Sequence, residues 1–453
     1  MKSFTTTQDM AQYEVSQDYC EPYLGATHDD LQAARFNKYD THIDKNEFFI
    51  YDDVNHKYNI YRRVEYIENT STAYIDTGFK NGASAWSLDT IISFNQIKTC
   101  FLFGGRGSSS THYLQYTKLV SNNFSTSVHM TTVNDTENPV LSNKKYHLHG
   151  SIKSLTIDYK DINEETQEEI EKSFTITNSG NYVNNGQPIF IFGVYGTINA
   201  NNNLNGKLYE FKLYNSSNKL IRDFIPVKNT LTNQYGLLDT VEQKFYVSPN
   251  GVEFNGGNEI IEDKDGVQYY IKNYINVSNN QRYVCTFNPK GNDSWEGKFH
   301  FNGTGRQDIL GAWNSQGQRQ FGFMGVDNNQ MRFLYNTQTI YTSGYNIYGN
   351  KTFTLKTNKN KFYIYNADNT LMYQSSATYV SDNHPVRYFG IGHLEGSVYA
   401  SDAKMYYFKY WQGDTLTFDF IPVQRISDNI YGLYDKITNV FYQSNGGTEF
   451  TGG

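Results

Sequence analysis

The chain has 453 residues and a net charge of −7, and this acidic balance excludes a basic surface for nucleic acid or anionic membranes. Its 39 Tyr, 30 Phe and 36 Gly with only 8 Pro favour half-buried sheets joined by turns, so we expect an all-β fold. The first residues lack the apolar stretch of a signal peptide, and no run approaches the roughly 18 apolar residues of a membrane span. We therefore expect neither nucleic-acid partners nor membrane insertion.

Residues 1–60 are expected to form an N-terminal attachment and oligomerisation segment. Residues 29–36 begin with two aspartates and continue with good helix formers, which predicts a short helix. A segment of this size and composition buries little core by itself, so we expect it to dock on a partner or on sister subunits. The protein is accordingly expected to be a homo-oligomer.

Residues 61–257 predict a first antiparallel β-sandwich. Residues 63–68 and 73–78 alternate apolar and polar side chains, as half-buried strands do. Clusters of Asn, Gly, Ser and Asp separate the later runs, a pattern typical of sandwiches and jelly rolls. These runs cover residues 88–94, 99–103, 146–152, 155–159, 173–176, 189–192 and 208–214.

Residues 258–453 repeat this order and predict a second sandwich. The polar stretch 258–267 follows a Gly-Gly pair and is interpreted as the connection between the two domains. The expected strands cover residues 269–275, 283–287, 299–301, 320–324, 331–335, 352–356, 362–366, 387–391 and 405–411.

A block at residues 224–257 returns at residues 420–453, and this duplication ties the two domains together. The Phe-Ile-Pro-Val run at 224–227 recurs at 420–423, and the final Gly-Gly pair recurs in the same register, 196 residues later. A spacing near 200 excludes solenoid repeats, whose periods are roughly 20–50 residues. The opening of the second copy is less similar to that of the first.

Short motifs near both ends of the first copy carry a family resemblance. They lie at residues 64–68, 74–78, 206–209, 223–227, 236–239 and 245–246. Together they resemble the laminin-G-like, concanavalin A-like jelly-roll domains found in bacteriophage virion and tail fibre proteins; the second copy keeps only the C-terminal half of the pattern. The resemblance implies two tandem concanavalin A-like jelly rolls in a non-enzymatic virion protein, assembled in the host cytoplasm. It further implies adhesion or host-surface glycan binding, with residues 1–60 contacting other virion proteins.

Two other functions use the same fold: a soluble carbohydrate-binding lectin and a glycoside hydrolase. A retaining glycosidase needs two carboxyl groups roughly 5–5.5 Å apart, and no expected strand carries an alternating Glu-x-Asp-x-Glu run. The acidic residues 161–171 are interpreted as a solvated loop, so we assign no catalytic residue. A lectin would use exposed aromatic rings beside polar groups, for which Trp86, Trp295, Trp313 and Trp411 are the tryptophan candidates.

Metal binding is considered from the histidines, aspartates and cysteines. His147 and His149 would share a strand face, but two imidazoles alone do not define a metal site. Calcium could use aspartates, although turn capping is the favoured role of Asp239 and Asp435. Cys20, Cys100 and Cys285 lack zinc spacing and are interpreted as free thiols, so we assign no metal ligand and no cofactor. The aspartates with suitable chemistry for calcium are Asp76, Asp89, Asp223 and Asp239.

Overall fold

The computed structural model of the protein consists of β-strands joined by turns, and contacts divide it into two compact units, Glu47–Glu259 and Ile260–Gly453. No helix long and apolar enough to cross a membrane occurs among the residues described below. The helix expected at residues 29–36 lies outside these residues. The structure describes residues 47–453 except 53–56, 81–84, 107–113, 130, 163–168, 182–186, 195–202, 279–280, 286–292, 303–306, 315–318, 327–329, 336–337, 343–349, 359–360, 377–385 and 392–401.

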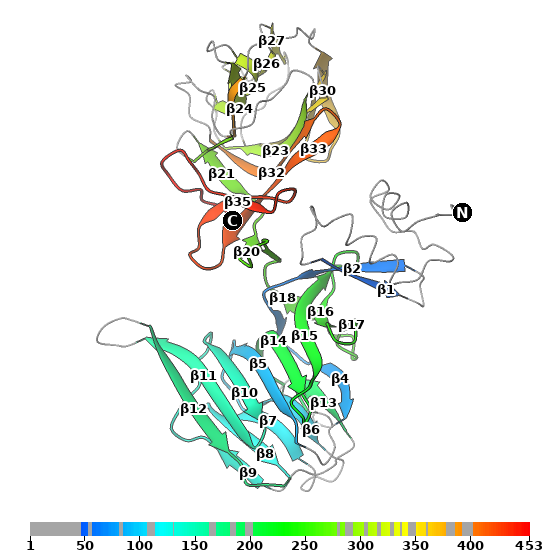
Figure 1. Cartoon of the computed structure of the whole chain (residues 1–453), viewed down its shortest axis with the longest axis vertical. Helices are drawn as coiled ribbons and strands as arrows, with labels where there is room; N and C mark the ends of the chain where they lie inside the picture. Colours follow the sequence, from blue (N-terminus) through cyan, green and yellow to red (C-terminus); the bar gives the residue numbers. More distant parts are fainter. Residues whose placement is uncertain are drawn as a thin grey trace. The chain divides into compact units, whose positions relative to one another are not determined.

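The first unit has a large sheet of 12 strands, whose main path runs β1-β2-β15-β14-β5-β10-β11-β12 (Figure 1). All pairings in it are antiparallel, as hairpin-rich chains favour. Its strands are β1 (Glu47–Asp52), β2 (Lys57–Arg63), β3 (Ile67–Asn69), β5 (Ser87–Phe94), β10 (Lys145–Ser151), β11 (Ser154–Ile162), β12 (Glu169–Thr177), β14 (Gly206–Tyr214), β15 (Leu220–Asn229), β16 (Tyr235–Asp239), β17 (Lys244–Tyr246) and β18 (Asn255–Gly256).

A six-stranded sheet with the order β4-β13-β6-β7-β8-β9 forms the second layer of this unit. Buried side chains from both sheets make one core; for example, Phe103 of β6 meets Phe211 of β14 edge to face at 5.6 Å between ring centroids. The strands of this sheet are β4 (Ile75–Lys80), β6 (Cys100–Arg106), β7 (Leu114–Val120), β8 (Asn123–Val128), β9 (Thr131–Asn134) and β13 (Pro188–Ile191).

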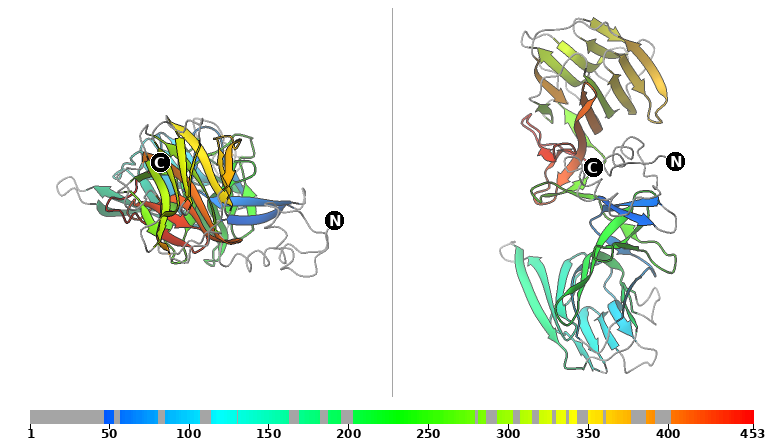
Figure 2. Two further views of the ribbon diagram at one scale, coloured as in Figure 1. Left: turned by 90° about the horizontal axis from the view of Figure 1, so that it is seen from above. Right: turned by 45° about the vertical axis from the view of Figure 1, so that its right-hand side comes forward.

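The second unit repeats both layers, with main paths β19-β20-β33-β32-β23-β28-β29-β30 and β22-β31-β24-β25-β26-β27. Figure 2 shows the strands of this unit, coloured from green through yellow to red, in two further views. The larger sheet, of 11 strands, comprises β19 (Ile260–Glu262), β20 (Gln268–Ile271), β21 (Ile275–Ser278), β23 (Ser294–Phe301), β28 (Lys351–Asn358), β29 (Lys361–Tyr365), β30 (Leu371–Ser376), β32 (Asp402–Gln412), β33 (Thr415–Arg425), β34 (Tyr431–Asp435) and β35 (Val440–Tyr442). The smaller comprises β22 (Tyr283–Cys285), β24 (Gln307–Asn314), β25 (Arg319–Val326), β26 (Gln330–Tyr335), β27 (Gln338–Tyr341) and β31 (Val386–Ile391). The predicted fold class, all-β with two tandem sandwiches, is confirmed.

Each unit opens with a hairpin that joins the large sheet. β2 pairs with β15 in the first unit as β20 pairs with β33 in the second. We expected the first sandwich to begin at residue 61, but β1 and most of β2 lie upstream of that point. Tyr61 shows why the hairpin belongs to the sandwich, because its buried ring packs on Phe245 at 4.6 Å between centroids. Tyr269 packs on Phe441 at 4.9 Å in the same way.

Each unit also closes with a glycine beside a tyrosine near its opening. The N–H of Gly257 donates to the carbonyl of Tyr66 at 2.9 Å, and the N–H of Gly453 donates to that of Tyr274 at 3.3 Å. A Cβ at position 257 would lie 2.8 Å from the ring of Tyr66, so a larger residue would not fit without movement. The repeated Gly-Gly pair therefore lets the end of each unit closely approach the strand that follows the opening hairpin, β3 in the first unit and β21 in the second.

Candidate functional site

The first candidate site lies on the outward face of the large sheet of the first sandwich. Leu148 of β10 and Ile157 of β11 point into the core, so the alternation of a strand turns His147, His149 and Asp158 outward. His147 lies directly opposite Asp158 in the pairing of β10 with β11. The hairpin thus adds a carboxylate to the histidine pair noted in the sequence.

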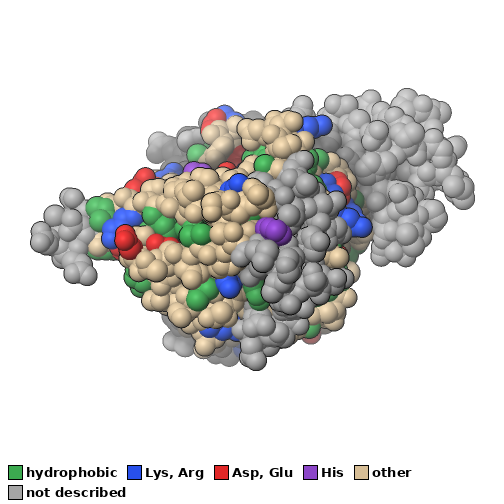
Figure 3. Space-filling view, turned by 90° about the horizontal axis from the view of Figure 1, so that it is seen from below, with side chains coloured by type: hydrophobic (Ala, Val, Ile, Leu, Met, Phe, Trp, Pro, Cys, Tyr) green, Lys and Arg blue, Asp and Glu red, His purple; other side chains and the backbone are tan. Residues whose placement is uncertain are grey.

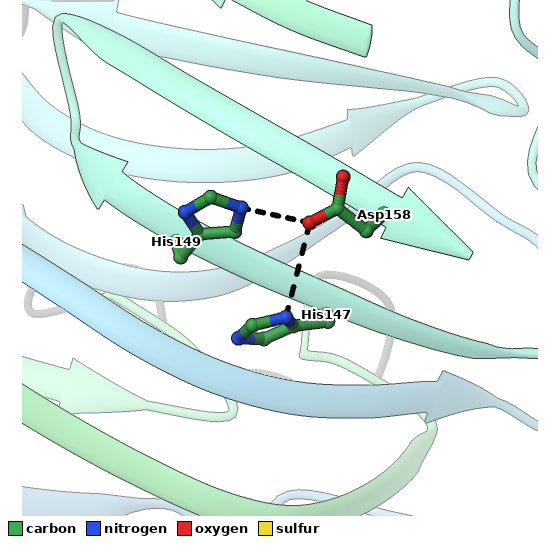
Figure 4. Close-up of side chains that lie close together, drawn as sticks. All are labelled: His147, His149 and Asp158. Carbon is green, nitrogen blue, oxygen red and sulfur yellow. Dashed lines mark hydrogen bonds and ion pairs between the residues drawn. The ribbon is translucent and has the colours of Figure 1, made fainter. Parts of the chain in front are cut away.

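The three side chains point toward one another (Figure 4). His149 Nε2 lies 2.8 Å from Asp158 Oδ2, and His147 Nδ1 lies 3.9 Å from the same oxygen. The two imidazole rings are stacked, with centroids 4.9 Å apart. One ligand atom from each residue lies within 4.8 Å of the others, which is close enough for the group to hold a metal ion. All three side chains are about 40% exposed, so solvent reaches them.

Two further polar groups orient this cluster. Asp89 of β5 accepts a hydrogen bond from His147 Nε2 at 2.9 Å. Burial opposes ionisation of Asp158, but hydrogen bonds from Ser173 and His149 outweigh it and hold the pKa of Asp158 below its usual value. Asp158 is therefore a carboxylate at neutral pH, and Asp89 fixes the ring of its neighbour His147.

The matching positions of the second sandwich have different chemistry. Strand pairing places Thr354, Lys356 and Tyr365 where the first sandwich has His147, His149 and Asp158. Lys356 forms an ion pair with Glu296 at 2.9 Å, and the hydroxyl of Tyr407 donates to the same carboxylate at 2.9 Å. This sheet therefore keeps charged side chains on its outward face but presents no imidazole at these positions.

A second candidate site is a shallow hollow of about 310 Å³ on the large sheet of the second sandwich. Tyr363 lies directly opposite Gln374, and the rings of Tyr363 and Tyr365 are nearly parallel with centroids 6.3 Å apart. Phe362 and Ile364 point into the core, so both tyrosines lie on the outward face. The hollow combines an aromatic ring, an amide, an ammonium and hydroxyls; its lining is Lys361, Tyr363, Gln374, Ser375 and Ser376.

The tryptophans considered as glycan platforms lie elsewhere. Trp86 and Trp295 are 2% and 3% exposed, so both belong to the cores and neither offers a platform. Trp411 is half-buried. Trp313 belongs to β24, but its side chain lies outside the part of the structure that is described. Sequence reasoning missed Tyr363, because no motif distinguishes it among 39 tyrosines.

The aspartates considered for calcium do not form one cluster. Asp76 lies on β4, where it caps a local turn by accepting from the N–H of Gly78 at 2.9 Å. Asp89 contacts His147 instead. Asp239 Oδ1 accepts from the N–H groups of Asp223 and Val241, so its predicted turn-capping role is confirmed.

Asp435 caps the equivalent turn of the second sandwich. Its Oδ1 accepts from the N–H groups of Asp419 and Ile437, and its Oδ2 accepts from the hydroxyl of Thr438. Asp239 instead has Arg222 Nε 3.3 Å from its Oδ2. Burial raises the pKa of both Asp239 and Asp435, while these hydrogen bonds oppose the shift. Cys100 is a buried free thiol, as predicted, and burial raises its pKa to about 12.

Charged side chains are sparse and mixed on the face shown in Figure 3, where backbone and uncharged polar groups cover most of the described surface. Hydrophobic side chains occur there in small separate spots. This face fits the polar, weakly acidic composition of the chain, and it offers hydrogen-bonding groups to a ligand.

Comparisons with known proteins give weak structural similarity alone. No protein-family model matches the chain, and no curated protein matches it. Among solved structures, it is similar to domains LG4-5 of the mouse laminin alpha1 chain at 9% identity, covering 80% of this chain and 90% of that one with a TM-score of 0.25. The LG1-3 region of the laminin alpha2 chain matches at 11% identity, with 78% and 62% coverage and a TM-score of 0.26. A sialidase of Trypanosoma rangeli in complex with sialic acid matches at 9% identity, with 78% and 95% coverage and a TM-score of 0.22. These scores are low, so the fold assignment rests on the two pairs of sheets themselves.

Proposed function

We propose that the protein is a non-enzymatic adhesion protein that binds glycans through the outward face of its second sandwich. The observation that carries this proposal is the hollow around Tyr363, where an aromatic ring lies beside an amide, a lysine and two serines. The C–H face of a sugar ring stacks on an aromatic side chain, and its hydroxyls need polar donors and acceptors at the edge. Gln374 and Ser376 are exposed and lie beside that ring.

A glycan array with the full chain tests this proposal. The array should identify at least one bound saccharide, and Tyr363→Ala should weaken its binding about tenfold, a loss of about 1.4 kcal/mol. Thr156→Ala is the matched control, because Thr156 occupies the equivalent place in the first sandwich and offers no ring. Equal losses of glycan affinity in the two variants would contradict the glycan proposal, and so would an array on which no saccharide is bound.

We further propose that the protein is a homo-oligomeric component of a bacteriophage virion, attached to other virion proteins by its N-terminal residues. Support comes from the sequence resemblance to the jelly-roll domains of virion and tail fibre proteins. Weak glycan contacts repeated on a symmetric particle would add up to strong adhesion.

Mass-resolved size analysis tests the assembly part of this proposal. The full chain should form a defined oligomer, and a chain that begins at Glu47 should be a monomer with both sandwiches folded. The cut belongs before Glu47 because β1 and β2 are part of the first sandwich. If the full chain is also a monomer, the virion proposal fails and the soluble lectin becomes the better description.

A further inference from the structure

We propose that His147, His149 and Asp158 form a binding site for a divalent transition-metal ion, and that zinc suits it best. The three residues come from two paired strands of a rigid sheet, and one ligand atom of each lies within 4.8 Å of the others. Two imidazoles with one carboxylate are a ligand set that zinc uses, with a water or substrate in the fourth position. This inference is independent of the glycan proposal, which concerns the other sandwich.

The hydrogen bond from His147 to Asp89 prepares the first ligand. A carboxylate only accepts hydrogen bonds, so Nε2 of His147 carries the proton at 2.9 Å from Asp89 Oδ1. The neutral ring then has its lone pair on Nδ1, which faces Asp158 Oδ2 at 3.9 Å. Metal-bound histidines commonly donate their second ring N–H to a carboxylate, which fixes the tautomer and strengthens the ligand.

Metal binding would need changes in the distances between the three ligand atoms. Ligand atoms on a tetrahedral zinc lie about 3.3 Å apart when each bond is about 2.0–2.1 Å. His149 Nε2 and Asp158 Oδ2 are 2.8 Å apart, which is closer than that. His147 Nδ1 and Asp158 Oδ2 are 3.9 Å apart, which is farther, and the three ligand atoms lie within 4.8 Å of one another. Zinc would take the place of the proton between His149 Nε2 and Asp158 Oδ2, and the neutral ring would then carry its one proton on Nδ1.

The ligand set also decides against the commonest biological cations. Calcium and magnesium prefer six or more oxygen ligands, whereas this cluster offers two nitrogens and one carboxylate. Imidazole favours zinc, copper and nickel. The fourth position is open to water, because the three side chains are about 40% exposed.

The second sandwich supplies an internal negative control. Thr354, Lys356 and Tyr365 hold the equivalent places and include no imidazole, and the ammonium of Lys356 would repel a cation. The same fold without the ligands should therefore bind no zinc at that face.

Zinc titration of the full chain by calorimetry, with zinc chloride as the probe, tests the site. His147→Ala and Asp158→Asn should each weaken the zinc affinity at least tenfold, because each removes one of three ligands. His300→Ala is the matched control; His300 lies on the outward face of β23 and bonds to Thr352, so its removal should leave the affinity unchanged. An excess of calcium should not compete.

Two outcomes would overturn the site. Zinc binding by His147→Ala and Asp158→Asn that equals that of the unchanged chain would show that the cluster is only a set of surface ion pairs. Absence of any zinc binding to a folded full chain would do the same. Asp89→Asn keeps all three ligands but removes the carboxylate that orients His147. It should therefore bind zinc more weakly than the unchanged chain but more tightly than Asp158→Asn.

Discussion

The two sandwiches share a strand order but differ on the outward faces of their large sheets. Leu148 and Ile157 of the first correspond to Leu355 and Ile364 of the second, and all four are fully buried or nearly so. Neighbouring outward positions differ: His149 and Asp158 of the first sandwich correspond to Lys356 and Tyr365 of the second. The core positions therefore maintain the fold, while the outward positions are free to acquire separate binding chemistry.

The largest expected effect tests whether the two cores are energetically separate. Phe211 and Phe408 occupy equivalent places, and both are fully buried. Phe211→Ala and Phe408→Ala should each destabilise their own sandwich by about 3–5 kcal/mol, because each leaves a large cavity. Calorimetric unfolding should show two transitions, and each variant should lower the midpoint temperature of one of them. If either variant lowers the midpoint temperatures of both transitions equally, the two sandwiches unfold as one unit.

A transplant of the cluster sharpens the comparison of the outward faces. Thr354→His, Lys356→His and Tyr365→Asp together would place the three ligands on the second sandwich, with Glu296 in the place of Asp89. We expect the triple variant to bind a second zinc equivalent, which the unchanged face does not bind. Calorimetric stoichiometry measures it.

The control for the transplant is the pair Thr354→His and Lys356→His without the aspartate. Two imidazoles alone should bind zinc far more weakly than the complete set. Equal zinc affinity of the double and the triple variant would mean that the carboxylate contributes nothing to binding. It would then also weaken the assignment of Asp158 as a zinc ligand.

The smallest expected effect concerns acid stability. Hydrogen bonds and ion pairs from Lys144 and Lys172, at 2.6 and 2.7 Å, hold the pKa of Asp161 well below its usual range. A lowered folded-state pKa stabilises the fold above the unfolded value of about 3.9, and this contribution is lost as the pH falls through the folded-state value. Asp161→Asn should therefore cost about 1 kcal/mol or less at pH 7, and less at lower pH.

Denaturant unfolding at several pH values measures this effect, and added salt should reduce it. Asp368, 207 residues later in the second sandwich, is the matched control because its carboxylate accepts from the backbone of Thr370 in a local turn. Salt should leave the effect of Asp368→Asn unchanged. A cost for Asp161→Asn that does not change with pH or salt would contradict the electrostatic explanation.

The sequence predicted the two sandwiches from their second halves, and strand pairing explains why the first halves were less clear. Val227 and Val423 are 196 residues apart, whereas the equivalent Ile67 and Ile275 are 208 residues apart. Length changes between the copies lie in the connections, so one fixed spacing cannot align both ends. Tyr66-Ile67 does recur in the second copy as Tyr274-Ile275, but the polar neighbours have changed.

The candidate sites depended on contacts that sequence spacing does not reveal. His147 and His149 were visible as a pair, yet Asp158 joins them only through the register of the β10–β11 hairpin. Tyr363 and Gln374 likewise meet across two paired strands, and neither stands in a distinctive motif. Alternating hydrophobicity predicts which face a residue occupies, but it does not fix the partner on the next strand.

The hydrogen bonds from Gly257 to Tyr66 and from Gly453 to Tyr274 have an evolutionary consequence. Apart from the opening hairpin, the chain of each sandwich ends beside the strand on which it begins, β3 in the first unit and β21 in the second, so the two ends of this part of the module are neighbours. A module with adjacent ends can be copied in tandem, or inserted into a surface loop of another protein, without any change in its strand order. Tandem duplication of such a module therefore requires no new topology.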